Sequence, residues 1–389
     1  MAYTVYGQQE VRARIDAAVR AGQLPNALLF SGSRYSGRLT TALETARKVM
    51  CHRSGAEDCS CESCRKFGEN SQPYAVMLLT RSMIQEIRAA ADVAVNDPDG
   101  TTMQLFILQV RKLLNRFLML GDDEGSKAQK QSVKLALEID DLLLQLSGSS
   151  AVLSRDIEQI LKKSEQLQGT VKSQNIPIAQ IRYLGNWLQT KPGNQRTVVI
   201  IEGVEFFTES TKNALLKLLE EPPGNTWFFL ISEFPGMIPR TILSRVRKYQ
   251  LLQREWEEEA RVISEVFRKL PDDYDSLKTL FLSNAGVNCR ELRDDAERFI
   301  SAALQRREVA YATLQADIQR ISKSGLFREF VEELINIIEL EVAESTMQRK
   351  KAAVVFGQIQ SAYRKVSQVN QNTSLALEAM YYAIRDYRL

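Results

Sequence analysis

Two short apolar runs, Val198–Ile201 and Trp227–Ile231, flank a stretch with helical periodicity. Each run is too short for a helix and is rich in β-branched or aromatic residues, which predicts two buried strands of a parallel sheet. Between them, Ser210–Leu219 places leucines on one broad face and is followed by two prolines, which predicts a helix that ends there. The pattern therefore predicts a βαβ unit within 197–249.

The same patterning extends the prediction to the rest of the chain. Residues 5–22 predict an amphipathic helix, and 27–30 and 74–80 predict further short strands. Residues 175–190 return to helical spacing just before the βαβ unit, and the chain after residue 252 is helical in pattern to its end. This order predicts an α/β module, with a parallel sheet flanked by helices, followed by all-α domains.

The strand signal disappears over residues 81–171. Apolar residues recur there at helical spacing, which predicts a helical hairpin with a third helix. The predicted helices cover 102–120, 127–146 and 152–167. Their polar faces mix both signs of charge, as solvated surfaces do, so this segment suggests no function by itself.

Composition narrows the class of protein. The chain has 389 residues, of which 44% are hydrophobic and 25% charged, a balance typical of a globular protein with two or three domains. A net charge of +3 excludes a strongly basic nucleic-acid binder, so any DNA contact would be local. The start lacks the apolar region of a secretory signal, and no apolar run is long enough to span a membrane. We therefore expect a cytoplasmic protein without a membrane partner.

A glycine-containing loop follows the first predicted strand. Gly32 and Gly37 have the spacing of a phosphate-binding loop, which also needs a Lys for the β/γ-phosphates and a Ser or Thr for Mg²⁺. Arg38 and Leu39 stand at those two places, and Thr40 comes one residue late. Arg is bulky and planar rather than a point charge, and one residue along a helix turns a side chain by about 100°. We predict a structural turn, with residual nucleotide binding as the alternative.

Four cysteines gather in a short segment. They are Cys51, Cys59, Cys61 and Cys64. In a reduced compartment, four thiolates satisfy a tetrahedral zinc ion and leave no open position for catalysis. The sequence therefore predicts a structural zinc site, with His52, the one histidine, as a substitute ligand and free cysteines as the alternative.

Several motifs together resemble one family. The segments that carry the resemblance are GQQEV, NALLFSGSRYSGRLTTAL, the cysteine module, IAQIRYLGNWL, KNALLKLLEEPP, TWFFLI and TILSRVR. On these segments the chain resembles the clamp-loader subunits of bacterial DNA polymerase III, in particular the delta-prime branch. The resemblance covers 1–80 and 172–300 by motif and 300–389 by position and helical character, and we know no counterpart for 81–171.

The resemblance implies the AAA+ fold. It assigns residues 1–252 to an AAA+ ATPase-like domain, 253–296 to a helical lid, and 297–389 to a helical collar that packs subunits into a ring. A zinc module at 51–64 and a helical insertion at 81–171 would then belong to the first domain.

The resemblance also implies a loss of catalysis. The gamma/tau members hydrolyse ATP, whereas delta-prime members have degenerate nucleotide motifs and do not. An active member ends its Walker B strand with an Asp for Mg²⁺ and a Glu that polarises water, and here Glu202 and Gly203 stand there. Together with Arg38 and Leu39, this implies that the isolated chain binds no ATP and shows little ATPase activity.

One arginine acquires a role from the resemblance. In the family, the Arg of a Ser-Arg-Cys motif reaches into the neighbouring subunit's ATP site, and here the motif is Ser244-Arg245-Val246. Arg suits that role because it is always charged and forks to phosphate oxygens. Arg245 would thus be a trans arginine finger, with Arg240 and Arg247 as nearby alternatives and a salt bridge within its own subunit as the structural alternative.

The expected function is that of a non-catalytic clamp-loader subunit. It would assemble with gamma/tau and delta subunits, supply Arg245 to a neighbour's ATP site, and help load the sliding clamp on primer–template DNA during DNA replication. Contact with the clamp itself would be weak or indirect. A self-sufficient AAA+ ATPase and a zinc-containing helical scaffold protein are the two alternatives.

Overall fold

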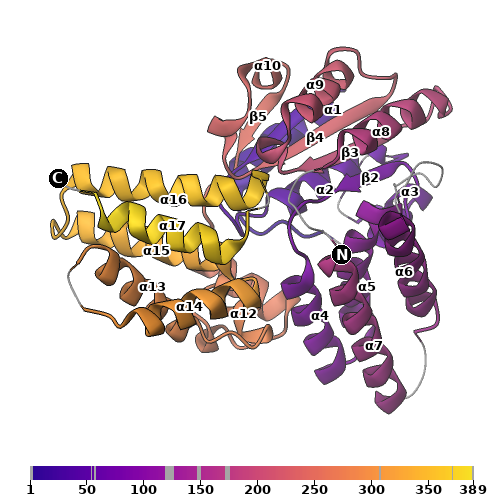
Figure 1. The fold of residues 1–389 in the computed structure, drawn as a ribbon. Coiled ribbons are helices and arrows are strands. Elements are labelled where there is room, and N and C mark those ends of the chain that lie inside the picture. The colour runs from indigo at the N-terminus through magenta and orange to yellow at the C-terminus, as the bar shows by residue number, and fades with distance from the viewer. Residues whose placement is uncertain are drawn as a thin grey trace. The chain divides into compact units, whose positions relative to one another are not determined.

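The computed structural model describes residues 3–53, 55–56, 58–118, 127–146, 150–170, 176–305, 308–369 and 371–387. They form two compact units, Met1–Ala285 and Gly286–Leu389 (Figure 1). The first unit contains the sheet and the three candidate sites, which are the loop after β1, the cysteine cluster and the Ser244-Arg245 corner, and the second unit is helical throughout its described elements.

A five-stranded parallel sheet forms the centre of the first unit, in the order β2-β3-β4-β1-β5. The strands are β1 (Ala27–Ser31), β2 (Ala75–Leu78), β3 (Thr197–Glu202), β4 (Thr226–Ser232) and β5 (Arg247–Gln250). The first four confirm the predicted strands, and with the flanking helices they confirm the predicted α/β module. Three of the four residues of β5 are exposed, so it has no apolar run that sequence patterning could find.

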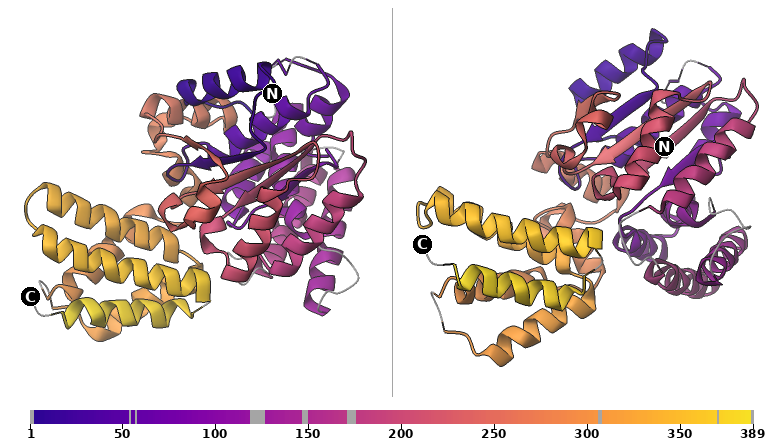
Figure 2. Two further views of the ribbon diagram at one scale, coloured as in Figure 1. Left: turned by 90° about the horizontal axis from the view of Figure 1, so that it is seen from above. Right: turned by 45° about the horizontal axis from the view of Figure 1, so that its top comes forward.

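Helices cover both faces of the sheet (Figure 2). Because successive strand residues point to opposite faces, Leu28 and Phe30 join the core on one face while Leu29 joins the core on the other. The first core includes residues of α1 (Gln9–Arg20) and α2 (Arg38–Met50). The second includes residues of α8 (Ile178–Thr190), α9 (Glu209–Glu220) and α10 (Arg240–Leu243).

A helical array lies between β2 and α8 in the chain, after the short helix α3 (Glu62–Gly68). Its members are α4 (Ile84–Asn96), α5 (Gly100–Leu118), α6 (Lys127–Leu144) and α7 (Ser150–Gly169). The last three confirm the predicted helices, except that residues 119–120 lie outside the described part of the chain. The patterning missed α4, whose buried face consists mainly of alanines and therefore carries little hydrophobic contrast.

The segment after β5 packs against α4. It contains α11 (Trp256–Arg261), one π-helical turn (Val262–Val266) and α12 (Leu277–Asn284). Ala89 and Val93 of α4 share a small core with Phe267 and Phe281 of this segment. Arg268 forms ion pairs with Asp97 and Asp99, at 2.5 and 2.6 Å, that tie the two parts together.

The second unit is a bundle of five helices among its described residues. They are α13 (Cys289–Ala303), α14 (Tyr311–Ser324), α15 (Phe327–Ala343), α16 (Arg349–Val369) and α17 (Thr373–Arg385). They bury one apolar core. The boundary that we expected between residues 296 and 297 falls inside α13, and the two compact units instead divide at residues 285 and 286. The assignment of lid and collar domains stays a prediction.

Among the described helices, none combines the length and the apolar character that crossing a bilayer would require.

Candidate functional site

The loop between β1 and α2 has the strand–loop–helix context of a phosphate-binding loop, and the arginine that follows it is already paired. Arg38 is the first residue of α2 and is buried. Its Nη2 lies 2.7 Å from Oε1 of Glu233, which follows β4 at the same edge of the sheet. The backbone N–H groups of Glu233 and Phe234 donate to Oε1 of buried Glu205, which holds the turn that carries Glu233. Burial raises the pKa of Glu205.

A second arginine covers the loop itself. Nη1 of Arg254 donates to the carbonyl oxygen of Tyr35 at 2.5 Å, and its Nε donates to the carbonyl oxygen of Tyr6 at 3.2 Å. A Cβ atom added to Gly37 would lie 2.5 Å from Nη2 of Arg254, so the guanidinium is in close contact with the loop backbone. The loop at Gly37 is thus already in contact with a positively charged side chain of the same protein, that of Arg254.

The end of β3 leaves no room for a catalytic carboxylate. Glu202 is buried, and its Oε1 lies 3.8 Å from Nε of Arg81. Gly203 has a φ of 76°, a region that side chains with a Cβ rarely adopt, and a Cβ there would collide with Oγ1 of Thr80. A Glu in place of Gly203 would therefore be strained, both by the backbone conformation and by the side chain of Thr80.

A cavity of about 360 Å³ opens beside the loop. It is lined by Gly37 and Thr40 of the loop and α2, by Arg254 and Phe281 of the following segment, and by Lys112 of α5. Nζ of buried Lys112 donates to Oε1 of Gln109 at 3.3 Å, and burial lowers the pKa of Lys112 to about 8. The helical array therefore contributes a cation to the crevice beside this loop.

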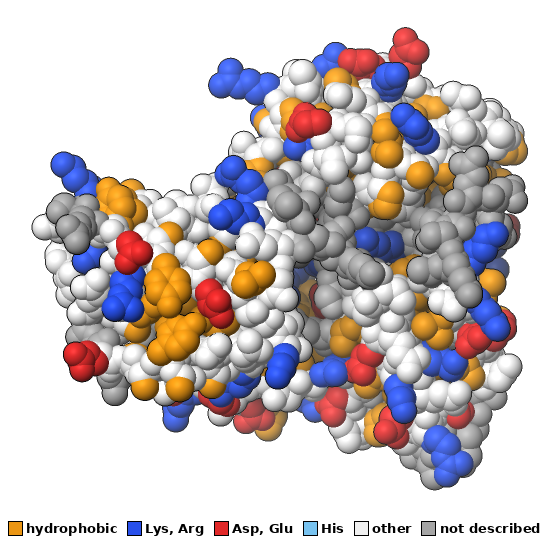
Figure 3. Space-filling view, viewed as in Figure 1, with side chains coloured by type: hydrophobic (Ala, Val, Ile, Leu, Met, Phe, Trp, Pro, Cys, Tyr) orange, Lys and Arg blue, Asp and Glu red, His pale blue; other side chains and the backbone are white. Residues whose placement is uncertain are grey.

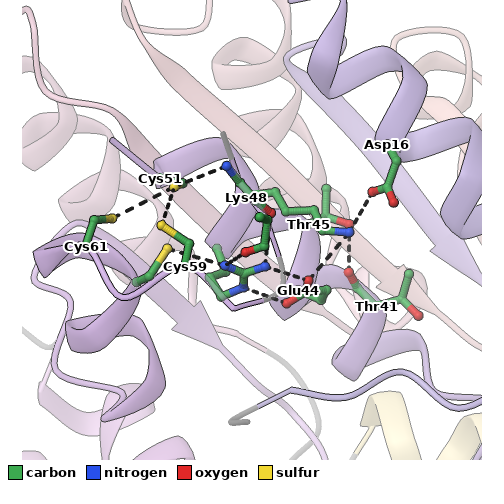
Figure 4. A network of polar contacts seen from close by, with 12 residues as sticks. Asp16, Thr41, Glu44, Thr45, Lys48, Cys51, Cys59 and Cys61 are labelled. Atoms are coloured by element: carbon green, nitrogen blue, oxygen red, sulfur yellow. Dashed lines mark hydrogen bonds and ion pairs between the residues drawn. The ribbon is translucent and has the colours of Figure 1, made fainter. Parts of the chain in front are cut away.

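The four cysteines form one cluster, as predicted (Figure 4). All four Sγ atoms lie within 4.8 Å of one another. Sγ of Cys51 is 3.5 Å from that of Cys59 and 3.9 Å from that of Cys61. Zn–S bonds of about 2.3 Å in a tetrahedron place sulfur atoms about 3.8 Å apart, so the cluster fits a zinc ion. His52 is exposed and does not belong to the cluster.

Backbone and side-chain donors surround these sulfur atoms. The N–H groups of Arg53 and Gly55 donate to Sγ of Cys51, each at 3.3 Å. Nη1 of Arg47 lies 3.3 Å from Sγ of Cys64, while Nε and Nη2 of Arg47 bind both carboxylate oxygens of Glu44. Arg47 belongs to α2, so the cysteine cluster is linked to the helix that begins at the phosphate loop.

The Ser244-Arg245 corner lies at the other edge of the sheet. It lies just before the start of β5, whereas the phosphate loop follows the end of β1. Because β1 and β5 are parallel neighbours, the two sites lie at opposite ends of the strands. Nη2 of Arg245 lies 2.5 Å from Oε1 of Glu220, and its Nη1 donates to the carbonyl oxygen of Thr241 at 2.8 Å. The hydroxyl of Ser244 also donates to Thr241, at 3.0 Å, and accepts from Nη1 of Arg245, at 3.4 Å.

The residue after the arginine anchors this corner. Val246 stands where the resemblance described above implies Cys, and it is buried in the same core as Ile238 and Ile242. Arg245 is exposed, as are the alternative fingers Arg240 and Arg247. The structural alternative, a salt bridge of Arg245 within its own subunit, is present in this structure, and its partner Glu220 is what the sequence did not name.

Sequence reasoning missed three residues of the crevice: Glu233, Arg254 and Lys112. Glu233 offered a usable signal, because it follows the strand next to the one that ends at Glu202, and the carboxyl ends of parallel strands share one edge. Arg254 offered none, since its contacts are with backbone groups far away in the chain. Lys112 follows Arg111 and precedes Arg116 on the same helix, and a basic residue in such a group is expected from sequence to be exposed.

A family model described as "DNA polymerase III, delta subunit" matches residues 7–121 and 145–255. This match covers more than half of the chain. It includes residues 81–121 and 145–171, most of the segment that we predicted to be an insertion without a counterpart, and leaves only 122–144 unmatched between residues 7 and 255.

Individual proteins show the same likeness over shorter stretches. The chain is 35% identical over 82 residues to the DNA polymerase III subunit delta' of Haemophilus influenzae, which is 21% of this chain and 25% of that protein. It is 44% identical over 54 residues to subunit delta' of Escherichia coli, 14% of this chain and 16% of that protein. The gamma/tau subunit of Mycoplasma pneumoniae is 27% identical over 111 residues, 28% of this chain and 16% of that protein. The chain thus matches about a quarter or less of these relatives' length.

One solved structure spans almost the whole chain. A DNA polymerase III gamma subunit-related protein of Thermotoga maritima covers 96% of this chain and 98% of its own, with 16% identity and a TM-score of 0.34. We base no argument on a likeness of that size.

Proposed function

The chain belongs to the DNA polymerase III delta subunit family, and from that premise we propose that it is a non-catalytic, delta-prime-like subunit of a clamp loader. Its own crevice would hold no ATP, and its Arg245 would act in the ATP site of a neighbouring subunit.

The contrast between the two edges of the sheet supports this proposal. At one edge Arg38 is buried against Glu233, Arg254 contacts the loop, and Gly203 excludes a carboxylate. These features disfavour both the binding of phosphates and the activation of water. At the other edge Arg245 is exposed. The degenerate nucleotide motifs are part of the proposal. The observation that carries it is that Arg38 is paired with Glu233 while Arg254 contacts the loop.

Arg245 would act as an arginine finger. Its planar guanidinium can fork to two oxygens of a γ-phosphate and stabilise the charge that develops there during hydrolysis. Such fingers contribute about 10³–10⁵ in rate in the best-studied GTPases. Ser244 would support it, because the Ser244 hydroxyl shares the Thr241 carbonyl with Arg245.

The partners are likewise proposed. A gamma/tau subunit would supply the ATP site, a delta subunit would complete the ring, and the helical second unit would serve as the collar that packs subunits together. The sliding clamp would be contacted weakly or indirectly, and primer–template DNA would be bound within the complex. On the face seen in Figure 3, Lys and Arg side chains are interspersed with Asp and Glu, so we assign no residue to DNA. A cytoplasmic location stays a prediction.

Reconstitution of the full chain with its gamma and delta subunits tests the finger. Arg245→Ala should assemble normally and should lower ATP hydrolysis at the neighbour's site by about 10³-fold or more, with clamp loading reduced accordingly. Arg247→Ala, an exposed arginine on β5, is the matched control and should hydrolyse ATP as wild type does. Unchanged hydrolysis for Arg245→Ala, or a loss with Arg247→Ala instead, would contradict the assignment.

We also propose that the cysteine cluster holds one structural zinc ion. Four thiolates at tetrahedral separations, with N–H donors to the sulfur atoms, support a closed site that stabilises the fold. Metal analysis of the purified chain should give about one zinc per chain. Cys64→Ser should lower both zinc content and thermal stability, whereas Cys289→Ser, a cysteine outside the cluster, should change neither. A zinc-free preparation with wild-type stability would defeat the proposal.

A further inference from the structure

The ion pair between Arg245 and Glu220 lies entirely on the surface. Oε1 of Glu220 is 2.5 Å from Nη2 of Arg245, and the two side chains are 40% and 36% exposed. The carbonyl oxygen of Thr241 accepts from Nη1 of the same guanidinium. Both terminal nitrogens of Arg245 therefore already have acceptors in its own subunit.

The backbones that carry this pair are fixed, whereas the side chains are not enclosed. Glu220 is the last residue of α9, whose Leu215 and Leu219 are buried in the core beneath the helix. Arg245 is followed by buried Val246, and its N–H donates to the carbonyl oxygen of Ile242 at 3.0 Å. The ion pair can therefore open by side-chain rotation alone, without moving either helix.

We propose that Glu220 is a positioning residue that holds Arg245 in a self-paired state until the γ-phosphate of a nucleoside triphosphate on the neighbouring subunit displaces the Glu220 carboxylate. This inference rests on the proposed finger role of Arg245. It adds that the finger is restrained before the neighbour's nucleotide arrives, so that hydrolysis depends on how closely the ring brings the two subunits together.

The chemistry favours such an exchange. A carboxylate and a phosphate present the same acceptor geometry to a guanidinium, but the phosphate carries more negative charge and more acceptor oxygens. An exposed ion pair is weak because water and salt screen it. The self-paired state would then hold back the finger by a factor of about five at most, which a neighbouring phosphate overcomes.

The next residue provides a control. Glu221 is also exposed and has the same side chain, but among the described residues it forms no ion pair. Glu220→Gln removes the charge of the restraint and keeps the shape of the side chain, and Glu221→Gln makes the same change one position away.

The experiment uses the full chain reconstituted with gamma and delta subunits, with assembly checked by gel filtration. ATP hydrolysis is measured with and without the sliding clamp and primed DNA. Glu220→Gln should raise the unstimulated rate about two- to fivefold and leave the fully stimulated rate nearly unchanged, so that the stimulation ratio falls. Glu221→Gln should match wild type in both conditions. The double variant Glu220→Gln/Arg245→Ala should behave as Arg245→Ala alone, because the restraint acts only through Arg245.

Each other outcome has a separate meaning. An unchanged or lowered unstimulated rate for Glu220→Gln would overturn the restraint, as would an effect of Glu220→Gln that persists in the Arg245→Ala background. A wild-type rate for Arg245→Ala would instead overturn the proposed finger itself. The failure of the inference and the failure of the proposed function can thus be told apart.

Discussion

Two arginine–glutamate pairs of similar length lie at opposite edges of one sheet. Arg38 and Glu233 are 2.7 Å apart, with side chains only 7% and 10% exposed. Arg245 and Glu220 are 2.5 Å apart, with side chains 36% and 40% exposed. The two N–O distances are similar, so the pairs differ mainly in burial. We infer that the buried Arg38–Glu233 pair is permanent and that the more exposed Arg245–Glu220 pair can exchange its partner.

The physical reason lies in the cost of leaving a charge alone. A buried guanidinium without its carboxylate keeps the full desolvation penalty, so Arg38 is confined to its own subunit. An exposed guanidinium is solvated by water when its ion pair opens, so Arg245 can leave Glu220 at little cost. We propose that nucleotide chemistry was lost at the Arg38 position and kept at the Arg245 position, and these two arginines differ in their surroundings rather than in residue type.

The largest expected effect comes from breaking the buried pair. Glu233→Ala leaves the charge of Arg38 buried without its carboxylate and should lower the free energy of unfolding by about 3–5 kcal/mol. Urea denaturation followed by circular dichroism measures it. Glu220→Ala is the matched variant at the exposed pair and should cost less than about 1 kcal/mol. Equal losses for the two variants would break the comparison.

A smaller effect should follow from adding a side chain at the end of β3. Gly203→Ala places a Cβ at a φ of 76° and against Thr80, which should cost about 1–3 kcal/mol of stability. Gly224→Ala, a glycine with nothing within 4 Å of an added Cβ, serves as the control and should be nearly neutral. Thermal unfolding of both variants checks this.

A second substitution at Gly203 tests whether the crevice can support ATP hydrolysis. Gly203→Glu introduces the carboxylate that the resemblance implies for an active ATPase. We expect no ATPase activity from it, because the backbone and Thr80 oppose the side chain and Arg38 stays paired with Glu233. Measurable hydrolysis by the isolated variant would show that the crevice is less closed than its contacts indicate.

Much of the fold could be predicted, because its elements carry strong local patterns. The runs that became β1, β3 and β4 are apolar and short, and α9 is followed directly by prolines. The missed elements lack such contrast: α4 buries mainly alanines, and β5 is a four-residue edge strand with three exposed residues. Tertiary pairing with β1, rather than local propensity, makes β5 a strand.

In the candidate sites, too, some residues could be predicted from the sequence and others could not. The four cysteines lie close in sequence, so their spacing alone predicted one cluster. Arg38, Gly203 and Arg245 could be chosen because motifs fix their position along the chain. Their partners could not be found from motifs, since each comes from a distant segment or another element.

The sequence by itself determined which groups are present: an arginine where a phosphate loop needs lysine, a glycine where catalysis needs a carboxylate, and an arginine after Ser244. Only the tertiary structure decided what each group does. The sheet order brings Glu233 to Arg38 and buries both, while α9 and α10 bring Glu220 to Arg245 and leave both in water. An ion pair's strength depends on its solvation, and solvation is a property of the packed chain rather than of the residues that form the pair.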